Sequence, residues 1–223
     1  MDLRYIGHSA FELKLANNSI LIDPFVQVNP EYNWREANIT DIFVTHAHGD
    51  HLGQAIEIAK EKDATITAVF ELANYLREQG CKVRPVGFGS WINYEWGRVV
   101  FVPAFHSSSL PDGRYAGEPA GIIFDVENVR IYHAGDTALT SEMKTIKELY
   151  RPNIAMLPIG GNYTMDVEHA VVASEWIGAQ TIIPMHYGTF PEIQADVEKF
   201  GQLLELNNSR CVVMNPKDNN NQN

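Results

Sequence analysis

Residues 42–53 read IFVTHAHGDHLG and place three of the chain's 8 histidines and one aspartate within six positions. The apolar run before them favours a buried strand, and apolar residues at helical spacing after them favour a helix. His46 and His48 point the same way in an extended segment, and Gly49 lets the backbone turn sharply. A polar loop between a strand and a helix is the simplest explanation. Imidazoles and a carboxylate crowded together instead suit a metal site.

Three later apolar runs also end at residues that can bind metal. RVVFVPAF ends before His106, VRIYHAG before Asp136, and TIIPM before His186. Strand ends meet along one edge of a sheet, which is where folds build sites. A lone strand-end histidine is usually a hydrogen-bonded polar residue, and an aspartate in GDT can cap a turn. The H-x-H-x-D-H cluster together with three such strand ends indicates a metal site, but for each of the three later residues taken alone these alternatives stay open.

The chain has 223 residues, 45% hydrophobic and 20% charged, which suits one globular domain with a sizeable core. We expect that domain at 1–216, followed by a disordered polar tail at 217–223. LRYIGHSAFELKL and SILIDPF read as short strands joined by the turn-prone ANN. Strand runs dominate and helices are interspersed, which predicts an α/β fold of sheets covered by helices.

The formal charge of 17 − 28 = −11 disfavours a nucleic-acid partner, because an acidic surface repels phosphate backbones. The start of the chain lacks the pattern of a signal peptide, and no apolar run approaches the roughly 18 residues that cross a bilayer. Cys81 and Cys211 form no CxxC pair, so we expect free thiols in a reducing compartment. The expected protein is cytoplasmic, has a small-molecule substrate and has no membrane partner. Its oligomeric state, a homo-oligomer included, stays open.

THAHGDH at 45–51, His106, GDT at 135–137 and His186 resemble the motifs of the metallo-β-lactamase superfamily of hydrolases, in the family's order. GHSAFEL, ILIDPF, PIGGNYTM and IPMHYGTFP are similar to one branch, which holds the L-ascorbate-6-phosphate lactonase-like proteins and related metal-dependent hydrolases. The resemblance implies a four-layer αβ/βα sandwich with a dinuclear site at one edge.

The resemblance also implies the metal ligands. They form one set for each ion, and one carboxylate bridges the two: His46, His48 and His106 for the first ion, Asp50, His51 and His186 for the second, and Asp136 between them. Asp23, in LIDP, would orient a ligand histidine, and a turn before Pro24 is an equal alternative.

Three further residues are candidates for substrate contact: His8, Asn162 and Tyr187. A turn cap explains His8 slightly better, and loop scaffolding explains the other two equally well. Arg114, in LPDGRYAGEP, is one candidate for a phosphate contact, although the sequence shows no convincing Lys/Arg cluster.

The implied cofactors are two divalent metal ions, and histidine-rich ligation admits zinc, manganese and iron. Water held by such ions loses a proton near pH ~7, and the resulting hydroxide would attack a small ester or lactone. Asp50 and Asp136 are the catalytic candidates, and the proton shuttle is either Asp50 or the ion-bound water. A small-molecule phosphodiesterase is the runner-up, and a metal-binding protein without turnover is the non-enzyme alternative. The intact ligand set argues against the latter.

Overall fold

The computed structural model describes residues 1–217. Contacts group this part of the chain into two compact units: unit 1 comprises Met1–Gly87, Ser107–Pro119 and the chain from Asn215, and unit 2 comprises Phe88–His106 and Ala120–Met214. A single domain at 1–216 therefore stays a prediction. The expected polar tail, apart from Lys217, lies outside the described residues.

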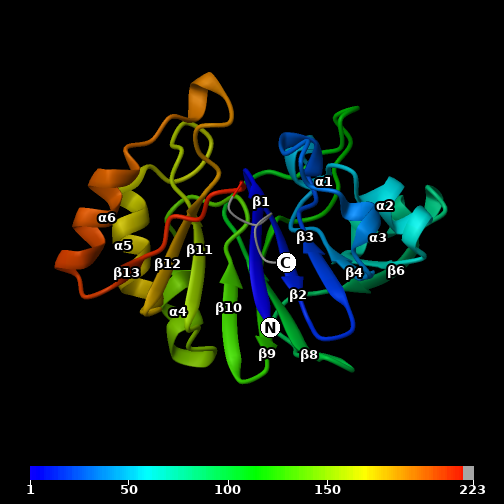
Figure 1. Ribbon diagram of the computed structural model, residues 1–223, viewed down its shortest axis with the longest axis horizontal. Coiled ribbons are helices and arrows are strands. Elements are labelled where there is room, and N and C mark those ends of the chain that lie inside the picture. The colour runs from blue at the N-terminus through cyan, green and yellow to red at the C-terminus, as the bar shows by residue number, and fades with distance from the viewer. Residues whose placement is uncertain (218–223) are drawn as a thin grey trace. The chain divides into compact units, whose positions relative to one another are not determined.

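Unit 1 is built on a six-stranded sheet in sequence order (Figure 1), composed of β1 (Asp2–Gly7), β2 (Ala10–Lys14), β3 (Ser19–Ile22), β4 (Ile39–Phe43), β5 (Thr65–Val69) and β6 (Lys82–Val86). The first three strands are antiparallel and the last four parallel. Helices α2 (Ala55–Lys62) and α3 (Phe70–Glu78) pack against β4–β6. The short helices are η1 (Val26–Val28), η2 (Trp34–Glu36) and α1 (Gly49–Leu52).

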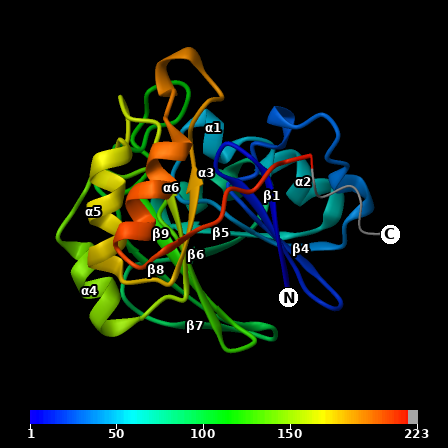
Figure 2. The same cartoon turned by 60° about the vertical axis from the view of Figure 1, so that its left-hand side comes forward.

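Unit 2 is built on a seven-stranded sheet in the order β13-β12-β11-β10-β9-β8-β7. Its strands are β7 (Ile92–Tyr94), β8 (Gly97–Pro103), β9 (Ala120–Val126), β10 (Val129–His133), β11 (Ile154–Pro158), β12 (Thr181–Met185) and β13 (Arg210–Cys211). β10–β13 are parallel, and β7–β10 are antiparallel. Helices α4 (Glu142–Leu149), α5 (Val167–Ile177) and α6 (Val197–Leu206) lie together on one side (Figure 2), and the short η3 is Pro191–Ile193.

Strand direction decides which loops meet in each unit. In unit 1, β1 and β3 are both antiparallel to β2, so both end at the edge where the parallel β4 ends. In unit 2, β8 and β10 are both antiparallel to β9, and both end at the edge where β11 and β12 end. The loops that follow these strands therefore lie at one edge of each sheet.

Two mixed sheets with helices confirm the α/β class, but the first strand run was read too coarsely. LRYIGHSAFELKL is a hairpin, because the chain reverses between Gly7 and Ala10 and His8 takes a left-handed backbone with φ 57°. Within residues 1–217, no helix combines the length and the apolar character needed to span a bilayer. Cys81 and Cys211 are free thiols, as expected, and burial raises the pKa of each.

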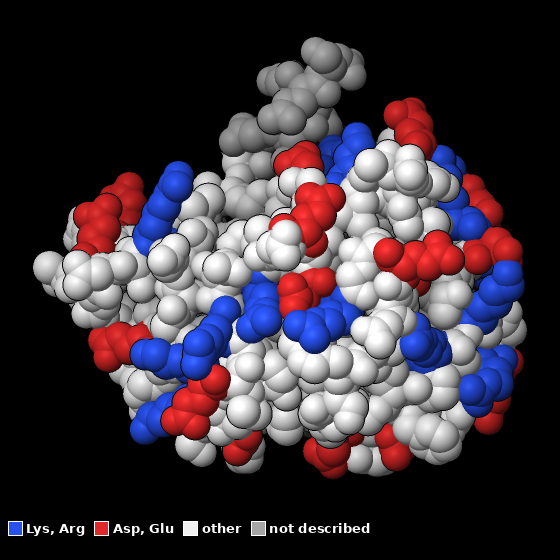
Figure 3. All heavy atoms as spheres, turned by 90° about the horizontal axis from the view of Figure 1, so that it is seen from below, with Lys and Arg blue, Asp and Glu red and all other residues white. Residues whose placement is uncertain are grey.

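Charged side chains of both signs are interspersed on the face shown in Figure 3, so the Lys and Arg residues on that face do not form one continuous basic surface. Several cations are held by neighbouring carboxylates. Arg98 Nη2 lies 2.7 Å from Asp125 Oδ2, and Arg130 Nε lies 3.2 Å from the same oxygen. The expectation of no nucleic-acid partner stays a prediction.

Gly53 provides a test of the close packing behind α1. Its backbone has φ 45°, and a Cβ atom there would lie 2.4 Å from the Pro24 carbonyl oxygen and 2.6 Å from Phe25 N. We expect Gly53→Ala to lower the free energy of unfolding by about 2–4 kcal/mol. The added methyl group would collide with the backbone of Pro24 and Phe25, and backbone atoms cannot move aside as a flexible side chain can. Gly113→Ala is the matched control: it has φ 83° and nothing within 4 Å, so it should cost only about 1 kcal/mol. Equal losses in urea unfolding would contradict the packing argument.

Candidate metal centre

In unit 1, three loops bring imidazoles and carboxylates to the edge where β1, β3 and β4 end. One nitrogen each of His8 and His51 and one oxygen of Asp50 lie within 4.8 Å of one another. His8 Nε2 is 2.9 Å from Asp50 Oδ2, and His51 Nε2 is 4.0 Å from that oxygen. Both histidine side chains are fully buried, whereas that of Asp50 is 28% exposed. Nitrogen and carboxylate donors at these separations suit a divalent ion.

Asp23 organises this cluster from the end of β3. Its side chain is fully buried. Oδ1 accepts a hydrogen bond from Thr45 N at 2.8 Å, and Oδ2 accepts one from Thr45 Oγ1 at 2.7 Å. His51 Nδ1 lies 2.7 Å from Oδ2. A carboxylate on Nδ1 fixes the ring and leaves Nε2 for the cluster. This contact is the one that the implied orienting role requires.

Thr45 extends the network to His46, and sequence reasoning assigned it no role. Its hydroxyl donates to Asp23, so its oxygen can accept from His46 Nδ1, which lies 3.0 Å away. His46 Nε2 is then 3.0 Å from His48 Nδ1. Two nitrogens held at 2.0–2.1 Å by one tetrahedral ion would be about 3.3 Å apart. The two imidazoles therefore fit a shared ion. The only signal in the sequence was a hydroxyl residue directly before the H-x-H pair.

Unit 2 gathers its candidates around Asp136, which follows β10. Asp136 Oδ2 lies 3.5 Å from His106 Nε2, after β8, and 3.1 Å from His186 Nε2, after β12. The Asp136 and His186 side chains are each only 3% exposed. A buried carboxylate flanked by two imidazoles suits the shared-ligand role that the resemblance implies for it.

Thr137 fixes the loops around Asp136. Its buried hydroxyl accepts a hydrogen bond from Phe105 N at 3.0 Å and donates to Ala138 O at 2.8 Å, while its carbonyl accepts from Met165 N at 3.2 Å. The 159–165 loop also packs on His186, because a Cβ at Gly160 would lie 2.3 Å from the His186 carbonyl oxygen. Thr137 and Gly160 thus fix the positions of the three ligand-bearing loops relative to one another.

Several candidates have strained backbones. Left-handed φ angles occur at four non-glycine positions in these loops: His8 (57°), Asp23 (44°), Asn162 (56°) and His186 (53°). Such conformations cost about 1–3 kcal/mol each and concentrate at functional sites. The strain supports a functional reading of both loop clusters.

The remaining sequence candidates are Asn162, Tyr187 and Arg114. Asn162 is exposed in the 159–165 loop. Tyr187 is half-buried, and burial and the nearby Cys211 raise the pKa of its hydroxyl. Substrate contact by either residue stays a prediction. Arg114 Nε lies 2.8 Å from Asp112 Oδ2, and its hydrogen bonds hold the pKa of that carboxyl below its usual range. Arg114 is therefore already paired.

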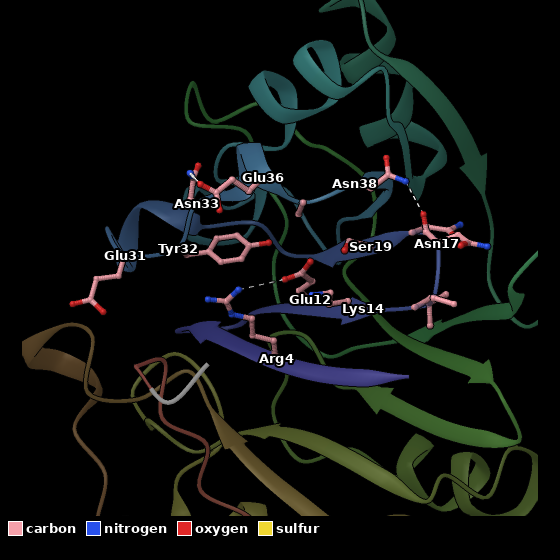
Figure 4. Close-up of a pocket in the computed structure, with 14 residues that line it drawn as sticks. Arg4, Glu12, Lys14, Asn17, Ser19, Glu31, Tyr32, Asn33, Glu36 and Asn38 are labelled. Atoms are coloured by element: carbon pink, nitrogen blue, oxygen red, sulfur yellow. Dashed lines mark hydrogen bonds and ion pairs between the residues drawn. The ribbon is translucent and has the colours of Figure 1, made fainter. Parts of the chain in front are cut away.

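A separate polar pocket of about 550 Å³ lies at the other end of the unit 1 strands (Figure 4). The buried Glu12 and Tyr32 line it, and the Arg4 guanidinium lies 4.8 Å from the Tyr32 ring centroid. Burial, and next the Glu12 charge, raise the pKa of Tyr32 far above its usual range. Ser19 and Asn38, which also line it, stand at the starts of β3 and β4, whereas His46 follows the end of β4. This pocket is distinct from the metal candidates.

Comparison with known proteins identifies relatives that are metal-dependent hydrolases, as the clustered histidines and aspartates lead one to expect. The sequence matches the beta-lactamase superfamily domain over residues 2–186. A UPF0173 metal-dependent hydrolase of Bacillus cereus is 43% identical over 212 residues, which cover 92% of this chain and 93% of the relative. This chain belongs to the metallo-β-lactamase superfamily. It is a metal-dependent hydrolase of that superfamily, and the clustered histidines and aspartates are its candidate metal-binding residues.

Solved structures confirm the metallo-β-lactamase fold expected from the sequence. A metallo hydrolase from the hyperthermophilic archaeon Ignicoccus hospitalis KIN4/I superposes with a TM-score of 0.89 at 35% identity, covering 96% of this chain and 94% of that one. The isothiocyanate hydrolase from Delia radicum gut bacteria superposes with a TM-score of 0.76 at 19% identity over 96% of this chain and 95% of its own. At that identity, the second likeness concerns the superfamily fold alone.

Asp23→Asn tests the orienting carboxylate. An amide cannot accept from Thr45 and His51 as the carboxylate does, so we expect zinc affinity to fall about 10–100-fold in competition with a chromophoric chelator. Asp63→Asn is the matched control, because Asp63 is exposed, pairs with Lys82 and has a left-handed φ that asparagine tolerates. A folded Asp23→Asn protein with unchanged zinc affinity would remove Asp23 from the metal centre.

Proposed function

We propose that this metal-dependent hydrolase cleaves a small carboxylic ester or lactone and uses two divalent ions. The observation that carries the proposal is the placement of Asp136 between the His106 and His186 imidazoles, 3.5 and 3.1 Å from their nitrogens. A buried carboxylate held by two histidines in this way is suited to bridge metal ions. The proposed ligands are those that the resemblance implies: His46, His48 and His106 for one ion, Asp50, His51 and His186 for the other, and Asp136 for both.

The donor set admits the same three ions as the sequence did. Imidazoles and carboxylates suit zinc, manganese and iron, and the proposed ligands contain no thiolate that would restrict the choice. Divalent ions bound there would acidify a water molecule and polarise the oxygen under attack. Zinc or manganese is our first choice, with iron as the third candidate.

The chain's own residues would position the reaction. Hydrolysis adds water across the acyl C–O bond: the carbonyl carbon gains the new oxygen, and the departing alkoxide takes the proton. Asp50 is the proposed proton carrier, because its side chain remains 28% exposed while His8 Nε2 holds Oδ2 at 2.9 Å. His8 thereby becomes a positioning residue for Asp50, a role that its place in the β1–β2 turn makes available.

An ester or lactone is our first choice over a phosphodiester because the one cation that the sequence offered for a phosphate is already paired. Phosphate recognition usually employs arginine or lysine. Arg114, the cation that the sequence offered, is engaged by Asp112 at 2.8 Å. A neutral carboxylic substrate needs no such cation.

Removal of metal and of single ligands tests the proposal. We expect EDTA to abolish lactone hydrolysis and Mn²⁺ or Zn²⁺ to restore it. Asp136→Asn and His48→Ala should each lower kcat/KM by about a thousandfold, because the reaction depends on the bound ions. His169→Ala is the matched control, since this histidine is exposed on α5 and pairs with Asp166 on the surface. Full turnover by Asp136→Asn or His48→Ala would refute the mechanism.

A further inference from the structure

Three exposed aromatic side chains in unit 2 accompany its metal candidates. Phe105 directly precedes His106, Tyr163 lies in the 159–165 loop, and Phe190 follows His186 by four positions. Their exposed fractions are 72%, 61% and 40%. We name Phe105, Tyr163 and Phe190 the aromatic rim. Because all three rings stand on or beside the loops that carry His106, Asp136 and His186, they are candidates to contact a ligand bound there.

Hydrogen bonds hold the three loops of the rim together. Phe105 is fixed on both sides, because its N–H donates to Thr137 Oγ1 and its carbonyl accepts from Ala138 N at 3.0 Å. Thr137 O accepts from Met165 N at 3.2 Å, which attaches the Tyr163 loop. That loop packs on His186 through Gly160, as described above. The rim is therefore a positioned part of the same edge that carries Asp136.

Phe190 is likewise held in place. Its carbonyl accepts hydrogen bonds from Ile193 N at 3.2 Å and from Gln194 Nε2 at 2.8 Å. The same segment closes back on itself, because Gly188 N donates to Ile193 O at 2.7 Å. The exposed ring thus sits on a closed turn that begins at the ligand candidate His186.

The side chains of these loops offer no cation to a charged substituent of the substrate. Segments 104–106, 134–141, 159–166 and 186–196 contain no lysine or arginine, and they contain four carboxylates: Asp136, Asp166, Glu192 and Asp196. Apart from the proposed metal ions, a phosphate group on the substrate would meet carboxylates here and no lysine or arginine. An uncharged group meets no such repulsion, and aromatic faces favour apolar chains.

We infer that the substrate is an uncharged ester or lactone with an alkyl or aryl chain, and that the aromatic rim binds this chain. The inference rests on the proposed function for the reacting bond, but it goes beyond it in naming what the rest of the substrate must be. Phe105, Tyr163 and Phe190 determine specificity by covering apolar substrate surface, and they take no part in bond cleavage.

The test compares two neutral substrates with the same reacting ring, γ-butyrolactone and γ-dodecalactone, using the Mn²⁺-loaded protein. We expect Phe105→Ala and Tyr163→Ala each to lower kcat/KM for γ-dodecalactone about tenfold, mostly through KM, and that for γ-butyrolactone by less than about twofold. Tyr163→Phe should restore the long-chain value, because the ring and not the hydroxyl is needed. Leu206→Ala is the control, since Leu206 is 78% exposed at the end of α6. Equal effects on both lactones, or none, would overturn the inference.

A binding measurement separates this inference from the proposed function. The γ-lactam analogues of the two lactones resist hydrolysis, and their binding can be followed by saturation-transfer NMR. We expect the long-chain lactam to bind the native protein about tenfold more tightly than Phe105→Ala. If the long-chain lactam shows this difference while neither lactone is hydrolysed, binding by the aromatic rim is supported and the proposed reaction is refuted. If the two lactams bind equally weakly, the rim assignment fails whatever the turnover.

Discussion

The carboxylate of Asp23 is the constraint on which the unit 1 site depends. An isolated buried anion is costly, and this one is tolerated because Thr45 and His51 donate to it. Those same donors belong to the loop that carries His46, His48 and His51. The need to satisfy one buried charge therefore fixes the path of the loop and the orientation of its imidazoles. The site is a consequence of hydrogen-bond satisfaction as much as of metal affinity.

In unit 2 a neutral residue, Thr137, fixes the positions of the ligand-bearing loops. Thr137 satisfies backbone groups from two other loops, and its neighbour Asp136 is held between two imidazoles. Both β8 and β10 are antiparallel to the strand between them, β9, so they run in the same direction. The ligand candidates that follow β8 and β10 therefore lie at the same edge of the sheet. A mixed sheet can thus deliver side chains from distant parts of the sequence to one edge.

Much of this arrangement could be predicted from local sequence. The strand before THAHGDH, the strand ends before His106, Asp136 and His186, and the α/β class are all local patterns of apolar spacing. His8 was harder, because its approach to Asp50 depends on the β1–β2 register, which a single run of apolar residues does not reveal. Thr45 was missed because a threonine beside a histidine motif has no distinctive spacing. The aromatic rim was invisible for a similar reason: only tertiary structure shows that Phe105 is exposed rather than packed.

The left-handed backbone at His8, Asp23, Asn162 and His186 has a consequence for protein engineering. Glycine relieves such strain and asparagine tolerates it, so a search for heat-resistant variants would favour these replacements. At His8, Asp23 and His186 each would delete an imidazole or carboxylate of the candidate centre. Thermal robustness and chemical competence are thus in direct conflict at these positions. Gains in durability must come from elsewhere in the two sheets, where the backbone is relaxed and the side chains carry no chemistry.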